Sequence, residues 1–163
     1  MKRFFAVAVL LAGMTAACAQ TSDTAKPNFA GTWKLNLQKS DLGQIAPDSE
    51  TDTVAQTAAD IKLTIASTGQ FPLNYVFSAK LDGTETPVAD DAFPADSPFR
   101  ILTSKAVWQG SSLVITQTTS FQDAKGTLTS TYSLSPDGKA LTKTTHIKFD
   151  AAEFDTTSVY DKV

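Results

Sequence analysis

The sequence predicts an all-β domain: an up-and-down antiparallel meander of about 8–10 strands that forms a closed or partly open barrel. Apolar and polar residues alternate with a period near two, as where Ile61, Leu63 and Ile65 alternate with Lys62 and Thr64. Valine, isoleucine, threonine and aromatic residues dominate such segments, which favours strands. Glycine-containing turns separate the segments, and no stretch of helical length has a 3.6-residue apolar period.

The N-terminus has the three-part layout of a secretory signal peptide. Lys2 and Arg3 precede an uncharged apolar stretch over residues 4–13, and small residues follow. The apolar run is shorter than the ~20 residues that a membrane span needs. We therefore expect a cleaved leader and exclude it from the fold.

Two cleavage sites compete at the end of this leader. The tripeptide centred on Cys18 fits the small-x-small pattern, which makes residues 1–19 the signal peptide and the protein periplasmic or secreted. Residues 14–18 also resemble the lipobox of bacterial lipoproteins, with Thr15 where leucine is usual. In that case the leader is 1–17 and Cys18 carries a lipid anchor. Both alternatives remain open.

The remaining chain reads as a polar tether over residues 20–28, which contains Pro27, and one domain over 29–163. Cys18 is the only cysteine, so the domain has neither an intramolecular disulfide nor a thiolate metal site. The formal charge is −3 and the basic residues form no stripe, which argues against nucleic acid as a partner. Membrane contact is expected only through a lipid on Cys18, and the oligomeric state is left open.

The strands follow one another at short intervals. We expect them over residues 30–37, 51–57, 61–67, 72–81, 84–88, 99–109, 112–121, 126–135, 140–149 and 153–161. Gly83, Gly110 and Gly138 stand where hairpin turns require positive φ. Two longer loops, 39–50 and 87–98, either overhang a barrel mouth or are solvated surface loops.

The segment Gly31-Thr32-Trp33 resembles the Gly-x-Trp opening strand of the lipocalin and fatty-acid-binding barrels. A longer ordered set is similar to an uncharacterised family of exported bacterial lipocalin-like proteins; it comprises residues 31–36, 39–43, 81–83, 108–110, 113–115, 134–139 and 159–162. The resemblance implies a lipocalin-like barrel and, by analogy, ligand carriage. Lipocalins usually place an arginine over the opening tryptophan, whereas the only arginine of this domain is Arg100.

Residues typical of catalysis are nearly absent. His146 is the only histidine and shares a strand face with threonines and a lysine, which indicates a solvent-facing position. No Gly-x-Ser-x-Gly nucleophile motif occurs, and no cluster of histidine or cysteine suggests a metal. Asp48, Glu50 and Asp52 alternate like oxygen ligands of a calcium loop but lack its glycine and distal glutamate, so we interpret them as solvated acids. We expect no enzyme and no cofactor.

Polar residues in the middle of otherwise apolar strand faces suggest an interior that is not solidly packed. Lys105, Gln117 and Lys143 are of this kind, and a buried lysine requires water, a counter-charge or a bound polar group. A single β-bulge would instead turn Lys105 or Lys143 to solvent. The residues predicted to line a ligand cavity are Trp33, Leu63, Phe77, Lys105, Gln117, Tyr132 and Lys143.

Two functions therefore compete. The first is a non-enzymatic envelope protein that binds a small apolar or amphipathic molecule in its barrel. The second is a structural or interaction domain with a filled core and no ligand. The volume of the interior discriminates between them, because drug-sized ligands occupy cavities of ~300 Å³ or more.

Overall fold

The computed structural model describes residues 26–43, 46–70, 72–122 and 124–163. The predicted leader, both cleavage sites and Cys18 lie outside the described residues. Within the described part, no helix is long and apolar enough to cross a membrane.

The predicted all-β fold is confirmed. The strands are β1 (Gly31–Leu35), β2 (Ser49–Gln56), β3 (Asp60–Thr68), β4 (Asn74–Lys80), β5 (Thr86–Pro87), β6 (Phe99–Gln109), β7 (Ser112–Phe121), β8 (Ala124–Leu134), β9 (Ala140–Phe149) and β10 (Ala152–Lys162). A short 3₁₀ turn, η2 (Asp90–Ala92), lies in the loop between β5 and β6. The turn glycines Gly83, Gly110 and Gly138 have φ of 84°, 61° and 67°, as the turn chemistry requires.

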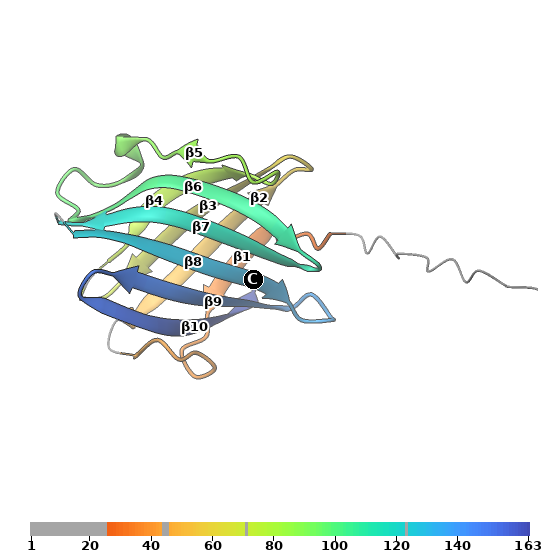
Figure 1. The fold of residues 1–163 in the computed structure, drawn as a ribbon. Coiled ribbons are helices and arrows are strands. Elements are labelled where there is room, and N and C mark those ends of the chain that lie inside the picture. The colour runs from red at the N-terminus through yellow and green to blue at the C-terminus, as the bar shows by residue number, and fades with distance from the viewer. Residues whose placement is uncertain (1–25, 44–45, 71, 123) are drawn as a thin grey trace, which may run out of the picture.

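The strands form one antiparallel sheet in the order β4-β3-β2-β1-β10-β9-β8-β7-β6-β5. In Figure 1 the strands β6 to β9 cross in front of β2 to β4, so the two halves of the sheet face each other across the interior. The edge strand β4 approaches β6, which lies next to the other edge strand β5; there the Ser104 hydroxyl donates a hydrogen bond to the Ser78 carbonyl at 2.9 Å. No strand ladder joins β4 to β6 among the described residues, so the barrel is nearly closed.

The opening tryptophan lies in the core. Trp33 is fully buried, and its indole N–H donates to the Phe29 carbonyl at 2.8 Å. Lys162 at the end of β10 lies over the Trp33 ring, with its Nζ 5.2 Å from the ring centroid. A lysine from the last strand thus covers the tryptophan where lipocalins usually have an arginine, while Arg100 lies over Phe93 at 5.6 Å.

The described end of the predicted tether contacts the barrel. The Gln56 side chain accepts a hydrogen bond from the Phe29 N–H at 2.9 Å and donates one to the Pro27 carbonyl at 3.0 Å. Phe29 is buried and stacks on Trp108 with ring centroids 5.8 Å apart. The residues that precede β1 are thus held against the barrel, with the Phe29 ring packed on Trp108.

The expected inward orientation of Lys105 is wrong. The register between β6 and β7 shifts between Ile101 and Thr103, which marks a β-bulge. Because side chains alternate along a strand, one extra residue reverses the faces beyond it. Ser104 and Ala106 therefore point inward and are fully buried, and Lys105 is exposed on the outer face.

Candidate functional site

A partly enclosed cavity of about 150 Å³ lies inside the barrel. Its lining side chains come from both halves of the sheet and from the loop between β1 and β2. They are Leu35, Leu42, Pro47, Glu50, Ser67, Leu73, Tyr75, Gln117, Leu128, Ser130, Tyr132, Lys143, Thr145, Ile147, Thr156 and Ser158. The lining is thus partly apolar and partly rich in hydroxyl groups, with two charged residues.

Lys143 and two carboxylates form the charged centre of this interior. The Lys143 ammonium lies 3.2 Å from Glu50 Oε1 and 3.7 Å from Asp52 Oδ2. The Tyr160 hydroxyl donates a hydrogen bond to the same Glu50 oxygen. The ammonium also lies 4.9 Å from the centroid of the Tyr160 ring. We call Glu50, Asp52, Lys143 and Tyr160 the interior ion cluster.

Strand alternation explains why these polar groups are inside. On β2 the inward positions are Glu50, Asp52 and Val54, of which Asp52 is fully buried and Val54 nearly so. On β9, Lys143 follows the fully buried Leu141 on the same face and lies opposite Tyr132 of β8. Once the apolar residues of a face are inside, the polar ones between them must follow.

Burial and charge act in opposite directions on the carboxylates of the cluster. Burial, reinforced by the nearby charge of Glu50, raises the pKa of Asp52 to about 6, although the Lys143 ammonium opposes the shift. For Glu50, burial also raises the pKa, but the Lys143 charge and the Tyr160 hydrogen bond outweigh it, so its pKa is lowered. Glu50 is therefore the more firmly ionised carboxylate of the pair.

Lys143 stays protonated in spite of its burial. Burial alone would lower its pKa, but Tyr160, Asp52 and Glu50 together raise it well above the ordinary value. A lysine held in this state is a cation and hydrogen-bond donor. It is unsuited to act as a nucleophile, which requires a free amine.

Several buried polar atoms have no hydrogen-bond partner within the described residues. They include Nε2 of Gln117, which lines the cavity and is only 4% exposed, and both carboxylate oxygens of Asp52. A buried polar group without a partner costs about 1–3 kcal/mol. Water or a ligand in the cavity would supply the missing partner of Gln117.

The two long loops contribute to the site. Leu42 and Pro47 from the first loop line the cavity directly. In the second loop, Phe93 is 7% exposed and stacks on Tyr75, with ring centroids 5.1 Å apart. Tyr75 in turn lines the cavity. Both loops therefore pack over the barrel interior, which is the first of the two alternatives predicted for them.

The structure brings together three of the seven predicted cavity residues: Gln117, Tyr132 and Lys143 line one space. Trp33, Leu63 and Phe77 are buried in the core, outside the cavity lining. Lys105 lies on the outer face, as described above.

Glu50 and Asp52 are the site residues that the sequence analysis missed. The interpretation of both as solvated acids is wrong, because their side chains are only 12% and 1% exposed. Their alternation with Val54 along the strand that follows the first long loop was the signal for an inward position. The lysine on a distant strand is the reason that this position is tolerated.

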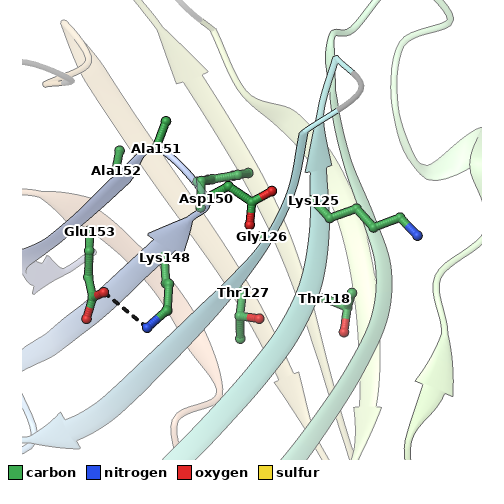
Figure 2. A pocket seen from close by; sticks show the side chains of 10 residues that line it. Thr118, Lys125, Gly126, Thr127, Lys148, Asp150, Ala151, Ala152 and Glu153 are labelled. Carbon is green, nitrogen blue, oxygen red and sulfur yellow. Dashed lines mark ion pairs between the residues drawn. The ribbon is translucent and has the colours of Figure 1, made fainter.

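A larger hollow of about 710 Å³ lies on the outer surface around the β9–β10 hairpin (Figure 2). It is open, and Lys148 on its wall is already paired with Glu153 at 3.1 Å. Figure 2 shows Lys125 and Thr127 on β8 and Lys148 on β9, and their side chains do not converge on one point. This arrangement has no buried polar group that calls for a ligand.

His146 lies on the outer face, as predicted. Its ring nitrogens face Glu153 at 3.3 Å and Asp155 at 2.8 Å, and the side chain is 44% exposed. No group of three or more histidine, cysteine, aspartate or glutamate side chains suited to a metal occurs in the described part of the chain.

Comparison with solved structures supports the barrel type. The fold is similar to that of zebrafish ileal bile acid-binding protein in complex with cholic acid, with a TM-score of 0.55 at 15% identity, over 83% of this chain and 98% of that one. Secretory abundant heat soluble protein 4 from Ramazzottius varieornatus gives a TM-score of 0.49 at 13% identity, over 82% of this chain and 94% of that one. No protein-family model and no curated protein sequence matches the chain. The expected lipocalin and fatty-acid-binding barrel type is thus confirmed as a fold.

Proposed function

We propose that this protein is an exported, non-enzymatic binding protein of the bacterial cell envelope that holds a small amphipathic molecule in its barrel. The observation that carries the proposal is the buried amide of Gln117, which lines a cavity and has no partner for its Nε2 among the described residues. Buried polar groups in a filled structural core are normally paired within the protein, so an unpaired amide on a cavity wall favours a bound partner.

The composition of the lining supports an amphipathic ligand. Leucine and isoleucine side chains cover part of the wall, and hydroxyl, amide and charged groups cover the rest. Sites for small molecules combine apolar walls with a few placed polar groups in this way. The similar bile acid-binding barrel was solved with cholic acid, an amphipathic molecule, which agrees with this use of the fold.

The size of the cavity limits the ligand. Its volume of about 150 Å³ lies below the ~300 Å³ expected for a drug-sized molecule. The ligand is therefore a short molecule, or a longer one whose remainder extends past the loops that carry Pro47 and Phe93.

The test is native mass spectrometry of the protein purified from its own host. We expect a retained small molecule that is lost on denaturation, and lower retention in Gln117→Leu. Thr118→Val, one residue further along β7 on the outer face, is the matched control and should retain the molecule fully. A parent protein that carries no molecule, and that binds none of a panel of apolar and amphipathic probes, would leave the structural-domain alternative in its place.

A further inference from the structure

The interior ion cluster is unbalanced in charge. Glu50 and Asp52 contribute two carboxylates, and among the described residues that line the cavity Lys143 is the only cationic one. The other polar groups on the cavity wall are uncharged hydroxyls and the Gln117 amide. With both carboxylates ionised, the interior carries one negative charge in excess.

The cation of the cluster is already engaged. Its ammonium faces Glu50 at 3.2 Å, Asp52 at 3.7 Å and the Tyr160 ring at 4.9 Å. A carboxylate ligand would have to displace one of these partners and would add a third negative charge to a poorly solvated space. Isolated charge in such a space is costly, so the cluster disfavours anionic ligands.

Acceptors for hydrogen bonds, in contrast, remain open. Neither oxygen of Asp52 has a hydrogen-bond partner among the described residues, but both are buried behind the cavity wall, so Asp52 acts on a ligand through its charge alone. Glu50 uses Oε1 for both of its hydrogen bonds in the described part of the chain, and its side chain lines the cavity. An ionised carboxylate only accepts, so the second oxygen of Glu50 can take a donor from a bound molecule, and an ammonium group supplies three.

We propose that the cavity binds a small amine, whose ammonium group pairs with the Glu50 carboxylate on the cavity wall, next to the buried charge of Asp52, and whose short apolar body lies against the leucine and isoleucine walls. The inference rests on the proposed function and names its ligand class. The bound cation brings the formal charge of the interior to zero. The Gln117 amide, which can present either its N–H₂ or its carbonyl after a half-turn, contacts the same polar end.

The test uses three probes that share one tail: hexylamine, 1-hexanol and hexanoate. Binding to the purified mature protein is measured by isothermal titration calorimetry at pH 7.5. We expect hexylamine to bind at least about tenfold more tightly than 1-hexanol, because the attraction between two opposite charges is stronger in a poorly solvated site than in water. Hexanoate should bind most weakly, because the same site repels its charge.

Two variants test whether the preference for the amine depends on the Glu50 carboxylate. Glu50→Gln should reduce the advantage of hexylamine over 1-hexanol to less than about threefold, since it removes the excess charge. Glu85→Gln is the matched control, because Glu85 is exposed, and should leave all three affinities unchanged. If Glu50→Gln does not fold, Asp52→Asn removes the same charge from the next inward position of β2.

The outcomes separate this inference from the proposed function. Tightest binding of hexanoate, equal binding of the amine and the alcohol, or an amine preference that survives loss of either carboxylate would overturn the inference and leave a binding protein. Failure of all three probes to bind would overturn both.

Discussion

Lys143 on β9 and Glu50 on β2 form an ion pair across the barrel interior, with 3.2 Å between Nζ and Oε1. Their strands are not neighbours, because β1 and β10 lie between them in the sheet. The pair is therefore not a cross-strand pair between hydrogen-bonded neighbours. It connects side chains of the two halves of the sheet seen in Figure 1.

Removing the cation from this pair should destabilise the protein strongly. Lys143→Met leaves Glu50 and Asp52 buried without a counter-charge, and breaking a buried pair in this way costs about 3–5 kcal/mol. Urea unfolding measures the loss. Lys105→Met is the matched control, since that side chain is exposed, and should change stability by less than about 0.5 kcal/mol. Equal effects of the two variants would mean that Lys143 is solvated rather than buried.

Trp33→Ala should cost about 3–5 kcal/mol, because it leaves a large cavity in the core and removes the indole hydrogen bond to Phe29. Trp108→Ala, which truncates a half-buried ring of the same type, should cost less. Thermal or urea unfolding of both variants checks the order. A Trp33→Ala protein as stable as its parent would contradict the assignment of this residue to the core.

Asp52 makes a specific contribution to the pH dependence of stability. Its pKa is raised from 3.8 to about 6 in the folded state. The folded state then binds more protons than the unfolded state between these values, so this contribution falls as pH rises from 4 to 7. Compared with Asp52→Asn, the parent should lose stability on the order of 2 kcal/mol across that window. Unfolding free energies of both proteins at pH 4 and pH 7 provide the measurement, and parallel profiles would show that the carboxyl group is not buried.

Cys18 decides between the two predicted N-termini. If the lipobox is processed, the mature chain begins with a diacylglyceryl cysteine, and Cys18→Ser releases the protein from the membrane fraction. Lipid chains contribute ~0.8 kcal/mol per buried CH₂, so the change in fractionation should be large. A mature chain that begins at Gln20 and is found free of the membrane would contradict lipid anchoring. Intact mass and fractionation of the protein from its own host give both answers.

Much of the fold was predictable from the sequence because strands and turns leave local signals. Period-two alternation identified strands such as β3, where Ile61, Leu63 and Ile65 are all buried. The inward positions of Gln117 and Lys143 were predictable for the same reason. Lys105 was not, because the bulge after Ile101 adds one residue to β6 without any change in local composition.

The alternation of β2 alone did not decide the position of the acidic half of the site. Glu50 and Asp52 follow a polar loop, and acids in such places are usually solvated. What makes their burial tolerable is a lysine 93 positions from Glu50, and only the connection of the sheet through β1 and β10 places the two together. The alternation with Val54 is a local signal for the face, but the ion pair itself joins residues far apart in the sequence and leaves no local pattern.

The most direct test of the central claim, that the barrel interior is a small-molecule site, is nuclear magnetic resonance of the ¹⁵N-labelled mature protein titrated with hexylamine and, separately, with 1-hexanol. We predict saturable one-site shifts of the Gln117 side-chain N–H₂ signals and of the Tyr132 backbone amide, and none at Lys125 or Gly126 in the outer hollow. Shifts confined to the outer hollow, or no saturable shift with either molecule, would contradict the claim.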